Sequence, residues 1–270
     1  MEHTFPAFES VPSGVTLHEI DIREALVQLC ADLRPAAIVH LAAQADVRIS
    51  VARPRFDADV NVLGTLRVLE AAQAVEAKIV FSSTGGAIYG ECPVPATEDA
   101  PRRPVSPYGT SKLCGEEYLA MFNRLYGSEH VALRFGNVYG PRQDPHGEAG
   151  VVAIFFGLLA EGKPTKVFGT GSQQRDYVYV GDVARAVVAS IDLPGGVLNV
   201  GTGRPTSDLE LHQACCRAAG VEQEPVFAPA RLGDLQRSVL DVSRAREALG
   251  WAPEVSLEQG LAETWATFAR

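Results

Sequence analysis

Short apolar, β-rich runs alternate with longer segments of helical periodicity from residue 15 to about residue 201. Runs such as Ala36–Ala42 are apolar on both faces, as a parallel sheet covered by helices on both sides requires. The alternation therefore predicts an α/β fold, a doubly wound parallel sheet with crossover helices. The predicted strands are Val15–Ile20, Ala36–Ala42, Lys78–Ser82, His130–Phe135, Lys166–Phe168, Tyr177–Val180 and Val197–Val200. The predicted helices are Ile22–Leu33, Arg55–Val75, Pro107–Tyr126, Asp182–Ile191 and Ser256–Phe268.

Three sites carry the residue patterns that begin helices. Asp21-x-x-Glu24 and Ser207-x-x-Glu210 match capping boxes, in which the first side chain accepts a backbone hydrogen bond at the helix start. Ser106-Pro107 places a capping serine before a proline at the first helical position. We expect a helix to begin just after each of them.

Charge and length exclude several classes of protein. The 270 residues contain 24 Lys and Arg against 33 Asp and Glu, a net charge of −9, which would repel nucleic acid and anionic membranes. The longest apolar stretch, near Gly150–Ala160, is shorter than the roughly 20 residues of a membrane-spanning helix, and Met1–Gly14 does not resemble a signal peptide. The 5 cysteines lack metal-ligand spacing, which favours reduced thiols in the cytoplasm and predicts no metal site.

Tyr108-Gly-Thr-Ser-Lys112 is the first pattern that indicates chemistry. On a helix, the i, i+4 spacing places the phenol and the ammonium on one face. A neighbouring positive charge lowers the pKa of a tyrosine from about 10 towards neutrality, which creates a usable base. The pair therefore predicts a proton-transfer site.

A run of hydroxyls and glycines, Ser82-Ser83-Thr84-Gly85-Gly86, follows a predicted strand. Doubly wound sheets bind ligands at the carboxyl ends of their strands, so these hydroxyls are expected at the same edge as the tyrosine and lysine. Thr84 and Ser83 are both candidates for the catalytic hydroxyl.

Seven segments in a fixed order resemble the NAD-dependent epimerase/dehydratase family, a group of extended short-chain dehydrogenases/reductases that act on nucleotide sugars. The fold this implies is a Rossmann-type doubly wound sheet with a smaller C-terminal substrate-binding lobe, and the closest resemblance is to UDP-glucose 4-epimerases. The segments are His40-Leu-Ala-Ala-Gln44, Asn61-Val-Leu-Gly-Thr65, Ser82-Ser-Thr84, Tyr108-x-x-x-Lys112, Arg134-x-x-Asn-Val-Tyr-Gly-Pro-Arg142, Arg175-Asp-Tyr-Val-Tyr-Val-Gly-Asp182 and Asn199-Val-Gly-Thr-Gly203.

The resemblance implies NAD as the cofactor and gives roles to the catalytic residues. Tyr108 would take the proton of the sugar 4-hydroxyl, shared with Thr84 or Ser83, and Lys112 would bind the nicotinamide ribose. Ala42 and Ala43 would let the cofactor approach the backbone. The residues it places at the cofactor are Asp21, Ile22, Leu41, Ala42, Ala43, Gln44, Asn61, Ser82, Ser83, Tyr108, Lys112, Phe135 and Asn137.

The resemblance also implies a UDP-sugar substrate. Arg175 and Arg231 would bind the diphosphate, for which guanidinium groups are suited. A small residue at Ser238 would leave room for an N-acetyl group on the sugar. The residues it places at the substrate are Thr84, Asn137, Val167, Phe168, Arg175, Arg231, Asp234 and Ser238.

The residues after Thr84 favour one reaction of the family. Dehydratases carry an Asp-Glu pair there, whereas this chain has Gly85, Gly86 and Ala87. We therefore expect a 4-epimerase that works through a transient 4-keto sugar. Two alternatives stay open: another dehydratase or reductase of nucleotide sugars, and a non-catalytic binding or assembly subunit.

The family's first β-α-β unit, with its glycine-rich GxxGxxG turn, has no match in these 270 residues. We therefore expect a truncated NAD-binding domain formed by residues 1–136 and 174–202, and a nucleotide-sugar lobe formed by residues 137–173 and 203–270. The strand Ala36–Ala42 would lose its neighbour and leave backbone groups unpaired. Relatives form homodimers through helices that match Asn61–Val75 and Pro107–Tyr126, so a homodimer is expected.

Overall fold

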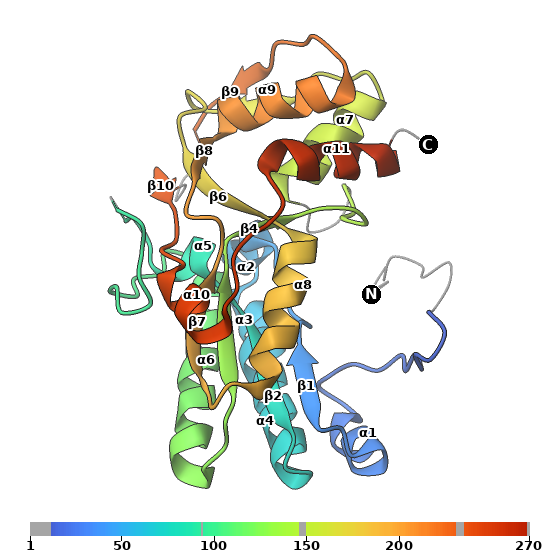
Figure 1. The fold of residues 1–270 in the computed structure, drawn as a ribbon, viewed down its shortest axis with the longest axis vertical. Helices are drawn as coiled ribbons and strands as arrows, with labels where there is room; N and C mark the ends of the chain where they lie inside the picture. Colours follow the sequence, from blue (N-terminus) through green and yellow to red (C-terminus); the bar gives the residue numbers. More distant parts are fainter. Residues whose placement is uncertain (1–11, 93, 146–149, 231–234, 269–270) are drawn as a thin grey trace.

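The central sheet of the computed structural model, which describes residues 12–92, 94–145, 150–230 and 235–268, has four strands. They lie in the order β1-β2-β3-β7, and all neighbours are parallel. Their carboxyl ends point towards a second group of elements (Figure 1). This arrangement confirms the predicted α/β fold. The strands are β1 (Ala37–His40), β2 (Lys78–Thr84), β3 (Val131–Phe135) and β7 (Gly196–Val200).

Helices cover both faces of this sheet. Alternate residues of β2 pack in opposite directions, as a strand buried on both faces requires: Ile79 and Phe81 pack with α4 and α6, and Val80 packs with α8 and α10. The first face carries α1 (Leu26–Leu33), α4 (Gly64–Ala74) and α6 (Pro107–Tyr126). The second carries α8 (Val180–Ala189) and α10 (Ser243–Leu249).

Helix α6 begins and ends where the sequence predicts. Ser106 caps its start by accepting from Gly109 N at 3.2 Å, and Gly127 ends it in the left-handed conformation with φ of 69°. The capping box at Ser207 and Glu210 is also confirmed at the start of α9 (Asp208–Ala219). The capping box at Asp21 is wrong, because the Asp21 carboxylate accepts from Arg23 N instead and α1 starts only at Leu26.

The predicted strand Val15–Ile20 is also wrong. These residues form neither a strand nor a helix, and both Val15 and Leu17 are more than half exposed. A strand needs a paired neighbour, and no described residue pairs with this segment. β1 likewise pairs only with β2 within the described ranges, so it forms the edge of the sheet with Val39 39% exposed.

The second group of elements lies beyond the carboxyl ends of the strands, at the top of Figure 1. Three helices pack together there around an aromatic core that contains Phe155 and Phe156. The helices are α7 (Val151–Ala160), α9 and α11 (Leu257–Phe268). Short strands form two further small sheets outside the central one, β10-β6-β4 with β8 on β6, and β5-β9. These strands are β4 (Asn137–Tyr139), β5 (Lys166–Phe168), β6 (Gln174–Tyr179), β8 (Pro205–Ser207), β9 (Val226–Ala228) and β10 (Arg237–Ser238).

The helix predicted over Arg55–Val75 is interrupted. It consists of α3 (Pro54–Ala58), a π-helical turn over Asp59–Leu63, and α4. Two further short helices, α2 (Val47–Ala52) and α5 (Gly85–Ile88), follow β1 and β2, and a 3₁₀ turn spans Ser190–Asp192. No helix in the described part of the chain is long and apolar enough to cross a membrane.

Candidate active site

Tyr108 and Lys112 lie on consecutive turns at the start of α6, as the spacing predicts. The Lys112 ammonium is buried, with only 2% of the residue exposed, and donates a hydrogen bond of 2.8 Å to the Ser82 carbonyl. It also lies 4.9 Å from the centre of the Phe81 ring. The lysine therefore connects α6 to the end of β2.

Gly115 permits this close approach of α6 to β2. A Cβ atom at Gly115 would lie 2.7 Å from Cζ of Phe81, which is closer than van der Waals contact allows. A side chain here would therefore require the Phe81 ring or the helix to move.

Ser83 and Thr84 differ in what surrounds their hydroxyls. Ser83 is 3% exposed and donates to Glu116 Oε1 at 2.5 Å. Thr84, at the last position of β2, points towards Gly86, since a Cβ there would lie 3.8 Å from Thr84 Oγ1 and 3.4 Å from Asn137 Oδ1. The two neighbouring hydroxyls thus face different parts of the molecule.

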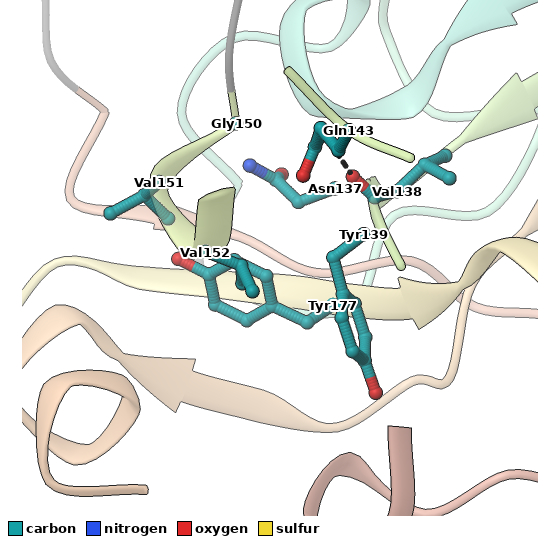
Figure 2. Close-up of a pocket in the computed structure, with 8 residues that line it drawn as sticks. All are labelled: Asn137, Val138, Tyr139, Gln143, Gly150, Val151, Val152 and Tyr177. Atoms are coloured by element: carbon teal, nitrogen blue, oxygen red, sulfur yellow. Dashed lines mark hydrogen bonds between the residues drawn. The ribbon is translucent and has the colours of Figure 1, made fainter. Parts of the chain in front are cut away.

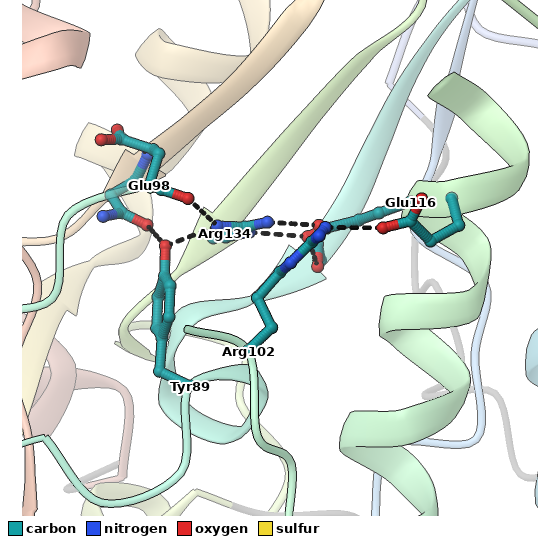
Figure 3. A network of polar contacts seen from close by, with 8 residues as sticks. Tyr89, Glu98, Arg102, Glu116 and Arg134 are labelled. Atoms are coloured by element: carbon teal, nitrogen blue, oxygen red, sulfur yellow. Dashed lines mark hydrogen bonds and ion pairs between the residues drawn. The ribbon is translucent and has the colours of Figure 1, made fainter. Parts of the chain in front are cut away.

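Glu116 belongs to a buried charged network shown in Figure 3. Arg134 of β3 makes two hydrogen bonds to the Glu116 carboxylate, 2.9 Å from Nε and 2.6 Å from Nη2, with both side chains 2% exposed. Arg134 Nη1 also donates to the Tyr89 hydroxyl at 2.7 Å and to the Glu98 carbonyl at 2.9 Å. Burial raises the pKa of Tyr89 to about 12, so this phenol stays neutral at physiological pH.

The loop after β1 is fixed by a second network, around Asn61. Asn61 donates to the Gln44 carbonyl at 2.8 Å and accepts from the Gln44 amide at 2.9 Å. The Asp57 carboxylate, which is fully buried, accepts from Gln44 Nε2 at 2.8 Å, from Asn61 Nδ2 at 3.0 Å and from the Ser111 hydroxyl at 2.6 Å. This network joins the loop to α6.

Asp57 and Glu116 were not among the residues singled out in the sequence. Asp57 gives no sequence signal, because a single carboxylate in a helical segment usually faces solvent. Glu116 does give one: it follows Lys112 by four residues and Tyr108 by eight, so all three share one face of the helix.

Other predicted cofactor residues lie along the same edge of the sheet. Leu41 is 60% exposed, Ala42 is exposed and Ala43 half-buried, and Phe135 ends β3. Asp21 and Ile22, expected at the end of a strand, lie in a turn that packs against α4. The Asp21 carboxylate pairs there with Arg23, and Ile22 contacts Gly64.

Several of the predicted substrate residues lie on the short strands β5, β6 and β10. Ser238 is 6% exposed, contacts the Gly86 carbonyl from Oγ at 3.4 Å, and pairs with Arg175 in the β10–β6 register. Arg175 Nη1 donates to the Leu235 carbonyl at 2.8 Å. On β5, Val167 is 1% exposed and Phe168 is half-buried. Arg231 and Asp234 lie outside the described residues.

Asn137 lines a small pocket between β4, β6 and the start of α7 (Figure 2). Gln143 reaches across its rim and donates to the Val138 carbonyl at 3.2 Å. Tyr177 forms the opposite wall, and Gly150 and Val151 close one side. The amide of Asn137 is thus part of the lining of this pocket.

His40 is a further titratable group near Lys112. It is 4% exposed, lies 3.0 Å from the Thr65 hydroxyl through Nε2, and its pKa is lowered to about 3 by burial and by the charge of Lys112. A neutral, packed histidine fits the interpretation of His40 as a strand residue. Within the described ranges, no group of three or more His, Cys, Asp or Glu could hold a metal ion.

The edge formed by β1, β2 and α6 fits the nicotinamide end of a dinucleotide. The small side chains of Ala42 and Ala43 leave their backbone accessible. Asn61 fixes the backbone of the next residue, Gln44, and Lys112 brings a buried cation to the end of β2.

Comparisons with known proteins agree with this geometry. Residues 3–201 match the model of the NAD dependent epimerase/dehydratase family. The chain belongs to this family. A UDP-glucose 4-epimerase of Mycolicibacterium smegmatis is 53% identical over 243 residues, which are 88% of this chain and 78% of that protein.

Solved structures of the epimerase/dehydratase family have the same fold. The UDP-glucose 4-epimerase of Thermotoga maritima, crystallised with UDP-glucose, is 45% identical with a TM-score of 0.90, and the match covers 93% of this chain and 83% of that one. The UDP-glucose 4-epimerase of Thermus thermophilus in complex with NAD is also 45% identical with a TM-score of 0.90, covering 96% and 86%. NAD is therefore the cofactor of the family to which this chain belongs.

Proposed function

We propose that this chain interconverts UDP-glucose and UDP-galactose, or their N-acetylated counterparts, by NAD-dependent epimerisation at C4. The observation that carries the proposal is the hydrogen bond from Lys112 to the Ser82 carbonyl. This bond holds α6, which carries Tyr108 and Lys112, against the end of β2, which carries Thr84. The identity of 53% to a UDP-glucose 4-epimerase supports the choice of reaction.

The nicotinamide and its ribose would be held between α6 and the loop after β1. Lys112 would bind the ribose, Asn61 would keep the backbone of Gln44 in place, and Ala42 and Ala43 would contact the cofactor. When bound, NAD⁺ supplies the reversible oxidation of the sugar carbon that carries the hydroxyl.

Proton transfer is the part of the reaction that falls to the side chains. Tyr108, as phenolate, would accept the proton of the sugar 4-hydroxyl, with the hydroxyl of Thr84 or Ser83 as its neighbour in the hydrogen-bond chain. The positive charge of Lys112 stabilises the phenolate. The 4-keto sugar would then rotate in the site so that its opposite face is presented for reduction. Tyr108 would return the proton to the same oxygen, which is then on a carbon of inverted configuration.

The UDP portion would lie across the second lobe. Arg175 and Arg231 would bind the diphosphate, Asp234 a ribose hydroxyl, and Val167 and Phe168 would flank the uracil. Asn137 and Ser238 would border the sugar, beside Gly86. Gly85, Gly86 and Ala87 of α5 offer no carboxylate, and an elimination of water would need both an acid and a base there.

The domain division and the assembly are further proposals. Residues 1–136 and 174–202 would bind NAD, and residues 137–173 and 203–270 the UDP-sugar. A homodimer through α4 and α6 would cover apolar side chains such as Leu63 and Leu125, which are 54% and 64% exposed. The 5 cysteines are free thiols, which supports a reducing compartment such as the cytoplasm.

Turnover of UDP-galactose by the purified chain with added NAD⁺ tests the reaction. We expect UDP-glucose to form, with inversion at C4 only, as followed by proton NMR. In D₂O, an epimerase of this mechanism returns the original hydrogen to C4, so no deuterium should become bound to C4. Binding of the UDP-sugar without turnover would support the non-catalytic alternative, and loss of the 6-hydroxyl would indicate a dehydratase.

A further inference from the structure

Arg134 makes contacts at both ends of the loop that follows β2. At the start of the loop, it holds Glu116, which accepts from the Ser83 hydroxyl at 2.5 Å. At the end of the loop, Arg134 donates directly to the Tyr89 hydroxyl at 2.7 Å. In the sequence, Thr84, Gly85 and Gly86 lie between these two attachment points.

The attachment is rigid because every group in it is buried and paired. Ser83 and Arg134 are register partners on β2 and β3, so their side chains emerge on the same face of the sheet, under α6. Tyr89 is fixed a second time, because its hydroxyl donates to Asn199 Oδ1 of β7 at 2.7 Å. A buried charge pair of this kind, with additional hydrogen bonds, holds its members in one geometry.

The bond between Ser83 and Glu116 also bears on how Ser83 lies relative to Tyr108, the proposed base. Glu116 follows Tyr108 by eight residues, which is a rise of about 12 Å along the helix. Side chains of both residues lean towards the N-terminus of the helix, so the separation of their polar ends stays similar. The Ser83 hydroxyl is therefore bonded to a residue two helical turns beyond Tyr108.

Thr84 lies on the other side of the strand. Successive side chains of a strand alternate between faces, so Thr84 points away from Glu116 and towards Gly86 and Asn137. It is also one residue closer than Ser83 to the carboxyl end of β2, where α6 begins.

We propose that Ser83, Glu116, Arg134 and Tyr89 form a clamp that positions the loop from Thr84 to Ile88, and that Thr84 alone is the hydroxyl that contacts the sugar. The four clamp members are positioning residues. The part of this inference that concerns the sugar rests on the proposed epimerase function. The part that concerns the loop does not.

Two variants loosen the clamp at its two ends. Ser83→Ala removes the bond to Glu116, and Tyr89→Phe removes the bond to Arg134. We expect both to increase hydrogen exchange of the backbone amides in residues 84–90 by at least fivefold. Ser190→Ala, which also removes one buried serine hydrogen bond, is the control and should leave exchange in this segment unchanged. Unchanged exchange in both Ser83→Ala and Tyr89→Phe would overturn the clamp.

Kinetics with UDP-galactose then separate positioning from catalysis. Ser83→Ala and Tyr89→Phe should lower kcat about tenfold or less with KM unchanged, and Ser83→Thr, which keeps the hydroxyl, should restore kcat. Thr84→Val should lower kcat by at least a hundredfold. The pH profile of Tyr89→Phe should match that of the wild type, because the phenol stays neutral.

The opposite ranking would overturn the assignment: a hundredfold loss in Ser83→Ala with a small effect of Thr84→Val makes Ser83 the catalytic hydroxyl. If the wild-type chain shows no turnover at all, the epimerase proposal fails. Hydrogen exchange still decides whether the clamp exists.

Discussion

The hydroxyl of Ser111 on α6 donates a hydrogen bond of 2.6 Å to the carboxylate of Asp57 on α3, a side chain with no exposed surface. The same carboxylate accepts from the amides of Gln44 and Asn61. Asp57→Ala would leave three buried donors without an acceptor. We expect the free energy of unfolding to fall by about 3 kcal/mol, measured in urea.

Asp57→Asn is the matched control for this effect. Its side-chain oxygen can still accept from Gln44 and Asn61, and the Ser111 hydroxyl can turn to accept from the new amide. The loss should therefore be about 1 kcal/mol. Asp99→Asn, at an exposed ion pair with Arg244, should change stability by less than about 0.5 kcal/mol. Equal losses in Asp57→Ala and Asp99→Asn would contradict the role given to Asp57.

Tyr108→Phe removes the proposed base and leaves the helix intact. We expect kcat for UDP-galactose to fall by about 10²- to 10⁴-fold, since this is the usual contribution of a positioned proton-transfer group. Tyr126→Phe, at the half-exposed end of the same helix, should retain wild-type kinetics. A Tyr108→Phe variant with wild-type kcat would exclude the phenol as the base.

Arg175→Met removes one proposed contact to the diphosphate. A charge-assisted hydrogen bond contributes roughly 1.5–3 kcal/mol, so KM for the UDP-sugar should rise by about 10- to 100-fold. Arg185→Met removes a guanidinium that pairs with Asp182 and Glu254 on the far side of the sheet. This variant should leave KM unchanged, and an equal rise in both variants would indicate a general effect of charge.

Ser238→Tyr tests the space beside the sugar. Ser238 is buried against the Gly86 carbonyl, so a larger side chain would occupy the room that a 2-acetamido group needs. We expect kcat/KM for UDP-GlcNAc to fall at least tenfold relative to UDP-glucose, whereas Ser238→Ala should accept both sugars. A wild-type chain that turns over UDP-glucose and excludes UDP-GlcNAc would contradict the prediction.

Stability should fall below pH 6.5 because His40 is buried in its neutral form. Burial and the charge of Lys112 lower its pKa to about 3, so the unfolded chain binds a proton that the folded chain does not. The contribution of neutral His40 to the free energy of unfolding is fully present above pH 6.5 and is lost as the pH falls towards 3. Between pH 7 and pH 5, this amounts to about 2 kcal/mol.

His40→Asn should flatten the dependence of the unfolding free energy on pH by that amount. Ser190→Ala destabilises the protein without removing a titrating group, so it should shift the free energy equally at pH 7 and pH 5. Parallel curves for the wild type and His40→Asn would show that His40 does not titrate between these states.

Most of the fold was predictable where local signals and burial agree. α6 has a serine cap, a proline at its first position and a glycine at its end, and its bounds match the prediction. β2 and β3 are apolar on both faces, and they lie at the centre of the sheet. Val15–Ile20 has the composition of a strand as well, but composition cannot supply the neighbour that pairing requires.

For the candidate site, the placement of Tyr108 and Lys112 was predictable from the sequence, and the hydrogen bonds between segments were not. The spacing of Tyr108 and Lys112 places them on one face of a helix, and the structure agrees. That Ser83 is bonded to Glu116 while Thr84 is not depends on the register between β2, β3 and α6. No local pattern encodes that register. The burial of carboxylates such as Asp57 cannot be predicted from the sequence for the same reason, because their hydrogen-bond partners come from other segments.

The π-helical turn over Asp59–Leu63 holds one residue more than a regular helix needs, and it carries Asn61. Each residue of an α-helix turns the chain by about 100°. Loss of a single residue from this turn would convert it to a continuous α-helix, and Asn61 would rotate away from Gln44 while α4 kept its place. A one-residue deletion would therefore remove the bond between Asn61 and Gln44 even though Asn61 itself was kept. Among homologous sequences, insertions and deletions should be rarer in this turn than at the surrounding surface.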